Sequence, residues 1–115
     1  MNDGAAAETR ALRHLEARGL RLIERNWRTR GGELDLVLRD RDTLVIAEVR
    51  ARSHAGFGGA AASVDARKRA RLVHAARAYL AAHPQYQSLP VRFDVVAIEA
   101  GGHMDWIRAA FEAEE

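Results

Sequence analysis

Two neighbouring segments that mix apolar and acidic residues constrain the fold of this chain most strongly. In the first, "ELDLVLR" at residues 33–39, leucines occupy every second position, and in the second, "TLVIAEVRA" at residues 43–51, β-branched residues dominate. Such patterns are typical of half-buried β-strands. The intervening "DRD" at residues 40–42 is typical of a tight turn. The sequence therefore predicts a β-hairpin.

The other segments predict an ordered set of helices and strands around this hairpin. An apolar stripe at helical spacing predicts a helix over residues 5–18, and strands are expected at residues 20–27 and 91–98. A second helix is expected from a cap at Ser63 to about residue 82, before Pro84. Residues 52–63 are rich in glycine and alanine and are expected to form a loop, and residues 104–111 a last short strand or turn.

The order of these elements predicts an α/β fold. Short turns between the first three strands imply an antiparallel meander, whereas the long helical crossover implies that strand 91–98 lies parallel to a neighbour. The expected architecture is a mixed β-sheet sandwiched by helices, in the order helix, three-strand meander, helix, one or two further strands. A length of 115 residues fits a single domain over residues 1–115.

The hairpin is expected to bring two carboxylates together. Strict alternation places Glu33, Asp35 and Val37 on one face of the first strand and Leu34, Leu36 and Leu38 on the other. On the second strand it places Glu48 on the same face as Leu44, Ile46 and Arg50. If the register sets Asp35 opposite or diagonal to Glu48, the two side chains are within reach of each other. Each acid taken alone also fits an edge strand that faces solvent.

Two close carboxylates need compensation. Two like charges at ~4 Å cost about 4 kcal/mol at an effective dielectric constant near 20. A raised pKa, a basic partner or a divalent cation relieves this cost. Carboxylate oxygens are suitable ligands for Mg²⁺ or Mn²⁺, so these are the expected cofactors.

Composition and charge limit the environment and the partners. The chain has no cysteine, which excludes disulfides and thiolate metal sites and suits a reducing compartment. No apolar run approaches the ~20 residues of a membrane span, and the N-terminus does not resemble a signal peptide, so a cytoplasmic protein without membrane contact is expected. Between Arg50 and Arg77 there are seven basic residues and one acid, Asp65. This local charge favours nucleic acid as the partner, although a solvated helix face fits it as well.

The hairpin motif also resembles that of a known class of nucleases. "GGELDL" followed by "IAEVRAR" resembles the PD-(D/E)xK signature, in which an Asp on one strand is followed by Glu-x-Lys on the next. The chain as a whole is similar to the YraN-type UPF0102 family, small relatives of archaeal Holliday-junction resolvases. The similarity rests on an ordered set of positions, namely Glu8, Ala11, Leu15, Gly19, Asn26, Gly32, Glu33, Asp35, Glu48, Val49, Arg52, Phe57, Gly58, Val64, Lys68, the run Arg92 to Val96, Ala110 and Phe111.

The resemblance implies a restriction-endonuclease-like fold and a role in DNA repair or recombination. It implies an endonuclease that acts on branched DNA with Mg²⁺ or Mn²⁺, and a homodimer, because a four-way junction presents two equivalent strands. Asp35 and Glu48 would be metal ligands together with the carbonyl of Val49. Glu8 would face the same site, although a surface position on its helix is an equal alternative, and Glu33 would be an outer group. Asp94 is expected to pair with an arginine rather than to bind metal.

The basic residues near the motif are the expected phosphate ligands. They are Arg52, Arg67, Lys68, Arg69 and Arg71. A catalytically inactive nucleic-acid-binding module and a protein-interaction domain with the same fold are the two alternatives to a nuclease. In the first alternative the carboxylates no longer support catalysis, and in the second they are only surface groups.

Arg50 is the departure from the nuclease pattern, because it stands where the motif has lysine. Arginine stays protonated and cannot act as a base, but it can neutralise charge and hold a phosphate through two hydrogen bonds. Of the 18 Lys and Arg residues only Lys68 is lysine, so Arg50 can reflect a chain-wide preference for arginine with activity retained. Alternatively, the site has become a binding surface. Arg50→Lys is expected to raise any cleavage rate.

Overall fold

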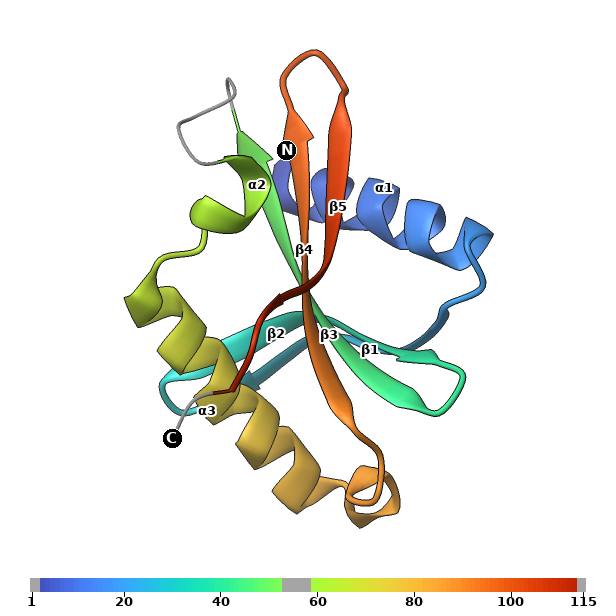
Figure 1. The fold of residues 1–115 in the computed structure, drawn as a ribbon, viewed down its shortest axis with the longest axis vertical. Coiled ribbons are helices and arrows are strands. Elements are labelled where there is room, and N and C mark those ends of the chain that lie inside the picture. The colour runs from blue at the N-terminus through green and yellow to red at the C-terminus, as the bar shows by residue number, and fades with distance from the viewer. Residues whose placement is uncertain (1–2, 53–58, 114–115) are drawn as a thin grey trace.

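The computed structural model describes residues 3–52 and 59–113. Its elements follow the predicted order, with two short helices in addition (Figure 1). They are α1 (Asp3–Ala17), β1 (Arg21–Thr29), β2 (Gly32–Asp40), β3 (Thr43–Arg52), α2 (Gly59–Ala62), α3 (Ala66–Ala82), the 3₁₀ helix η1 (Pro84–Tyr86), β4 (Val91–Glu99) and β5 (Met104–Phe111). None of the described helices is long and apolar enough to cross a membrane.

The strands form a mixed sheet in sequence order, β1-β2-β3-β4-β5. β1, β2 and β3 are the predicted antiparallel meander. The chain then crosses through α3, and β4 pairs parallel to β3, as the long crossover predicted. β5 returns antiparallel to β4 and is a strand rather than a turn. The predicted mixed α/β arrangement is therefore confirmed.

A helix covers each face of the sheet (Figure 1). On β3, Leu44 and Ile46 pack with the buried side of α3, while Val45 and Ala47 pack with α1. This division follows from the period of two along a strand, which sends successive side chains to opposite faces. The α1 side is filled by the apolar stripe that predicted this helix, Ala7, Ala11, Leu12 and Leu15.

The segment before α3 differs from the prediction. It does not form one continuous loop over residues 52–63, because β3 extends to Arg52 and Gly59–Ala62 form the short helix α2. Alanine has the highest helix propensity, which accounts for a helical turn in this alanine run. The expected loop positions Phe57 and Gly58 lie outside the described residues.

Asp65, not Ser63, caps α3. The carboxylate of Asp65 accepts a hydrogen bond of 2.9 Å from the backbone N–H of Lys68, and Asp65 has an extended backbone with φ −75° and ψ 175°. A capping side chain must reach N–H groups two or three residues ahead. Because the helix begins at Ala66, the cap is Asp65 and the predicted Ser63 is two positions too early.

Candidate metal and phosphate site

The β2–β3 register brings Asp35 and Glu48 together. Leu36 pairs with Ala47 at the end of the regular ladder, so Asp35 and Glu48 are the next residues of the two strands, and the charge of Asp35 acts on Glu48. The backbone N–H of Val49 donates a 3.0 Å hydrogen bond to Oδ2 of Asp35. The carboxylate of Asp35 thus serves as a partner for the β3 backbone at the point where the regular pairing between the two strands ends.

The strict alternation predicted for β2 is wrong at Leu34. Leu34 packs with Val37 in the cluster beneath α3, whereas Leu36 and Leu38 pack on the α1 side. An uninterrupted strand would place Leu34 with Leu36, so the regular pleat is interrupted between Leu34 and Leu36, at Asp35. Asp35 therefore occupies an irregular position in the strand, and its side chain is half-buried.

Glu48 is buried between opposite charges. Its side chain is 4% exposed, and its Oε2 lies 3.5 Å from Nζ of Lys68 and 3.8 Å from a terminal guanidinium nitrogen of Arg50. The other oxygen, Oε1, is buried and has no hydrogen-bond partner in the described structure. A buried carboxylate oxygen without a partner is costly, which makes Oε1 a natural point for a proton or a cation to bind.

Burial and the neighbouring acid raise the pKa of Glu48 to about 8. The main cause is the loss of hydration on burial, followed by repulsion from Asp35, while the charges of Lys68 and Arg50 act in the opposite direction. When Glu48 carries a proton, a hydrogen bond with Asp35 becomes possible and favours the protonated form further. Two of the expected ways to relieve the repulsion between the carboxylates are therefore present at Glu48, namely a raised pKa and basic partners.

Glu8 of α1 is turned toward the same region. Its side chain is 14% exposed, and an oxygen of its carboxylate lies 3.5 Å from the guanidinium of Arg25. Burial and the charge of Asp35 raise the pKa of Glu8, against hydrogen bonds from Asn26 and Arg25. Glu8 therefore lies within the electrostatic reach of Asp35 and is not a fully solvated surface residue.

The donor set suits a hard divalent cation. Glu48 offers a buried oxygen without a partner, and Asp35 retains an oxygen that does not accept from Val49. Among residues 3–52 and 59–113, no three His, Cys, Asp or Glu side chains are grouped so as to hold a metal ion alone. Mg²⁺ is commonly held by one or two carboxylates together with water and substrate phosphates, and the Asp35–Glu48 pair fits this pattern.

The other two predicted acids have partners of their own. The side chain of Glu33 is 41% exposed and forms an ion pair with Arg28, with 3.2 Å between its Oε2 and the Nε of Arg28. Asp94 is fully buried, and both of its oxygens accept hydrogen bonds from Arg92, at 2.9 and 3.1 Å. Trp106 donates to Asp94 as well, at 3.0 Å. The predicted pairing of Asp94 with an arginine is confirmed.

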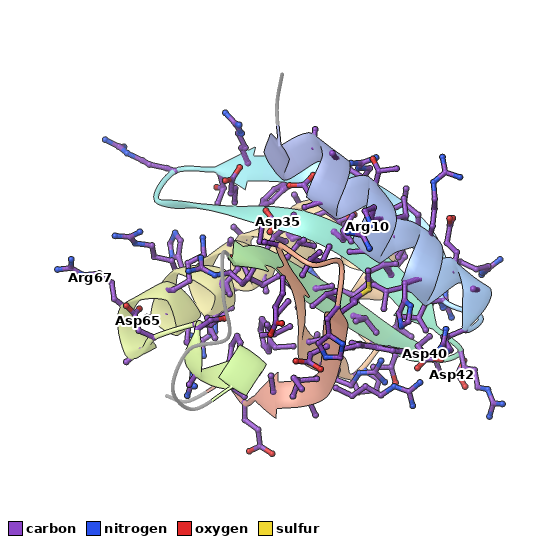
Figure 2. All side chains as sticks on the ribbon, turned by 90° about the horizontal axis from the view of Figure 1, so that it is seen from above. Arg10, Asp35, Asp40, Asp42, Asp65 and Arg67 are labelled. Atoms are coloured by element: carbon purple, nitrogen blue, oxygen red, sulfur yellow. The ribbon has the colours of Figure 1, made fainter. Side chains whose placement is uncertain are left out.

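The predicted basic residues of α3 separate into two groups. Lys68, which contacts Glu48, and Arg71 line an open groove together with Arg28 of β1 and Glu33. Arg67 is exposed and extends away from the sheet, whereas Asp35 lies near the middle of the molecule (Figure 2).

Arg69 is engaged in packing. Its Nε donates to the carbonyl oxygen of Val64 at 2.9 Å, and its guanidinium lies 5.5 Å from the ring centre of Phe111. The side chain of Arg52 lies outside the described part of the chain.

Arg28 is a groove residue that the sequence reasoning missed. It pairs with Glu33 across the short β1–β2 turn. The segment "RTRGGE", which places an arginine and a glutamate on either side of a glycine turn, was the available signal. Recognising it required treating this turn as a hairpin with a definite register.

Gly32 sets the distance between this hairpin and α3. A Cβ atom at Gly32 would lie 3.0 Å from the carbonyl oxygen of Arg71 and 3.3 Å from the Cβ of Ala75. The adjacent turn is also tied to α3, because Nε2 of His74 lies at hydrogen-bonding distance, 3.1 Å, from the carbonyl oxygen of Arg30. The absent side chain thus allows β2 to approach α3, the helix that carries Lys68.

The chain is similar over most of its length to a set of bacterial proteins. The family described as "Uncharacterised protein family UPF0102" matches residues 7–98. A UPF0102 protein of Pseudomonas entomophila strain L48 is 54% identical over 113 residues, which cover 95% of this chain and 92% of the relative. A UPF0102 protein of Stutzerimonas stutzeri strain A1501 is 53% identical, with 97% and 96% covered.

A third relative agrees with these two. A UPF0102 protein of Ectopseudomonas mendocina strain ymp is 54% identical over 112 residues, which cover 96% of this chain and 94% of the relative. Because the family match covers residues 7–98 and these relatives span nearly the whole chain, the resemblance to the UPF0102 family is confirmed. The protein belongs to the UPF0102 family.

Proposed function

We propose that this protein is a divalent-metal-dependent phosphodiesterase that cleaves structured, branched DNA in the cytoplasm. One observation carries the proposal: the buried Oε1 of Glu48 lacks a partner beside a second carboxylate, Asp35, and Lys68 connects Glu48 to a groove lined by basic side chains. A purely structural acid is usually satisfied by hydrogen bonds, as Asp94 is.

Asp35 and Glu48, with the carbonyl of Val49, would hold Mg²⁺ or Mn²⁺. When bound, such an ion lowers the pKa of a coordinated water and stabilises negative charge on the phosphate and the leaving oxygen. The hydrogen bond from the Val49 N–H orients the carboxylate of Asp35 in advance. This orientation reduces the reorganisation that binding and reaction require.

The cations beside Glu48 would offset charge on the phosphate during hydrolysis. In that reaction a water oxygen bonds to phosphorus, the ester P–O bond breaks, one water proton passes to solvent and the leaving oxygen takes up another. Arg50 and Lys68 both lie within 4 Å of Glu48. Fixed positive charge at this place stabilises the additional negative charge of the transition state.

The groove beside the pair supports binding of a nucleic-acid backbone. Arg28, Lys68 and Arg71 contribute positive charge from two elements, β1 and α3. Arginine matches phosphate geometry well, and contacts of this kind position a backbone without reading its sequence. Recognition would then depend on the shape of the DNA, as a branched substrate requires, and a homodimer would serve the two equivalent strands of a junction.

A non-catalytic DNA-binding module is the second candidate function. The observation that favours it is Arg50, since an always-protonated guanidinium stands where the nuclease motif has lysine. Such a module would keep the basic groove and bind branched DNA without cutting it.

Cleavage of a labelled four-way junction in Mg²⁺ or Mn²⁺ tests the proposal, with a linear duplex as the comparison. We expect cutting of the junction that is lost, by about 100-fold or more, in Asp35→Asn and Glu48→Gln. Glu16→Gln is the matched control, because Glu16 is exposed on α1, does not line the groove and should retain most activity. Cleavage that persists in the first two variants contradicts the assignment. Binding without cleavage by the natural protein supports the second candidate, and no DNA binding points to a protein-interaction domain.

A further inference from the structure

The geometry points to Lys68 as the lysine of this site, where it contacts the scissile phosphate in place of the motif lysine that β3 lacks. This inference deepens the proposed function and rests on it for the reaction. It assigns to Lys68 a part in the chemistry, whereas the sequence suggested only a general contact with the DNA backbone.

Lys68 reaches the buried acid more closely than Arg50 does. Both cations approach the same Glu48 oxygen, with the ammonium of Lys68 at 3.5 Å and the guanidinium of Arg50 at 3.8 Å. The side chain of Lys68 is 29% exposed and that of Arg50 is 40% exposed. The lysine of α3 therefore occupies the more enclosed position next to the carboxylate pair.

The backbone of Lys68 is held in place by two independent contacts of α3. The Lys68 N–H donates to the capping carboxylate of Asp65 at 2.9 Å, which fixes the first turn of the helix. The close approach at Gly32 holds the middle of the helix against β2. The Lys68 side chain is thus directed to Glu48 by the packing of α3 on the sheet.

Lys68 also borders the groove in which a phosphate would lie. It is a groove-lining residue along with Arg28 and Arg71, so its side chain connects the buried carboxylate with the open basic surface. An ammonium group is a compact charge with three donors and can contact a carboxylate and a phosphate oxygen at once. The planar guanidinium of Arg50 does not reproduce that arrangement.

The composition of the chain agrees with this assignment. Lysine occurs at a single position among 18 basic residues, and the ammonium group at that position contacts Glu48. Since arginine serves elsewhere on the surface, a lysine at this place is consistent with a requirement for the smaller cation.

Cleavage kinetics on the junction test the catalytic part of the inference. Lys68→Arg keeps the charge, and Lys68→Gln removes it. We expect both to lower the single-turnover rate at saturating protein by about 100-fold or more, a much larger factor than the change in the Kd for DNA measured in Ca²⁺. Arg50→Gln should lower the rate less, and Arg13→Gln, an exposed change on α1, serves as the control. A loss that arises only from a weaker Kd would make Lys68 a backbone contact and overturn the inference.

Binding of Mn²⁺, measured by calorimetry without DNA, gives a readout that does not depend on cleavage. Lys68→Gln removes a positive charge 3.5 Å from Glu48 and should tighten Mn²⁺ binding by about 5-fold or more, beyond the effect of Arg50→Gln. An unchanged Mn²⁺ affinity in Lys68→Gln, or a larger effect of Arg50→Gln, overturns the inference. If the natural protein binds Mn²⁺ but never cuts DNA, the proposed function fails, and the Mn²⁺ comparison still decides whether Lys68 is the principal cation of the site. If it binds no Mn²⁺, both are wrong.

Discussion

The burial of the Glu48 carboxyl group is unfavourable for folding but suits the proposed chemistry. The sheet buries this carboxyl group next to Asp35, and only partly offsets this with Lys68 and Arg50. Asp94 shows the opposite arrangement, because Arg92, Trp106 and a backbone N–H satisfy both of its oxygens. Burial alone therefore does not separate a structural acid from a candidate ligand. The number of carboxylate oxygens that have hydrogen-bond partners does separate the two kinds of acid.

The raised pKa of Glu48 predicts how stability depends on pH. The folded-state pKa of about 8 lies above the ordinary 4.5, so between these values folded Glu48 keeps a proton that the unfolded chain loses. The free energy of unfolding should then fall as pH rises from 5 to 8, by up to about 1.4 kcal/mol per pH unit. Glu48→Gln should remove most of this slope and be the more stable protein above pH 8. Urea unfolding from pH 5 to 9 measures it.

Glu33→Gln provides the comparison for this experiment. Glu33 lies on the same hairpin, and its replacement keeps the buried Asp35–Glu48 pair, so the fall in stability between pH 5 and 8 should persist. If natural protein and Glu48→Gln lose stability in parallel over this range, Glu48 is ionised in the folded state and the buried-proton account is wrong.

Among the elements, α3 has the largest part in assembling the site. Its cap positions Lys68, its first two turns border the groove, and its middle rests on Gly32. β2 contributes the irregular position at Asp35, and β3 contributes Glu48. The site thus depends on the distance between one helix and one hairpin.

Gly32→Ala tests this dependence. The added methyl group would meet the Arg71 carbonyl at 3.0 Å, so α3 and β2 must move apart, and we expect a loss of about 1–3 kcal/mol in the free energy of unfolding. Mn²⁺ affinity should change as well, because Lys68 moves with α3. Gly101→Ala is the matched control, since a Cβ at Gly101 meets no atom within 4 Å. Equal stability of the two variants would show that the contact at Gly32 is not tight in solution.

At the scale of the whole molecule, the fold brings residues that are far apart in the chain together on one surface. Arg28 lies on the edge strand β1, Lys68 and Arg71 lie on α3, and the parallel pairing of β3 with β4 requires the crossover that carries this helix past the hairpin. The net charge of +2 alone is too small to attract DNA strongly. The local concentration of positive charge in the groove favours a polyanion.

The salt dependence of DNA binding should identify this groove. The double variant Arg28→Gln/Arg71→Gln should weaken junction binding and reduce the slope of log K against log salt by about 2, since each lost phosphate contact removes about 0.9. Arg13→Gln/Arg18→Gln removes the same charge from exposed positions on and just after α1 and should reduce the slope much less. Fluorescence anisotropy across a salt series measures both. Equal slopes for the two double variants would contradict a role for the groove.

Local patterns in the sequence predicted most of the fold. The antiparallel meander follows from alternation and short turns, and the parallel β4 follows from the helical crossover. The errors are also local: alanines at the end of the expected loop form α2, and Asp65 replaces Ser63 as the cap. In the first case the alanines fit either a loop or a helix, and in the second either Ser63 or Asp65 can cap the helix. Small differences in propensity decide between the two possibilities.

For the candidate site, the sequence by itself placed Asp35 and Glu48 on adjacent strands of one hairpin, because a hairpin depends only on neighbouring strands and the turn between them. It did not determine that Glu48 would be buried with one oxygen unsatisfied, that Arg28 would join the groove, or that Lys68 would reach the carboxylate. Those contacts join residues that are distant along the chain. They exist only after α3 packs on the sheet, since packing alone sets the separation of a helix side chain from a strand.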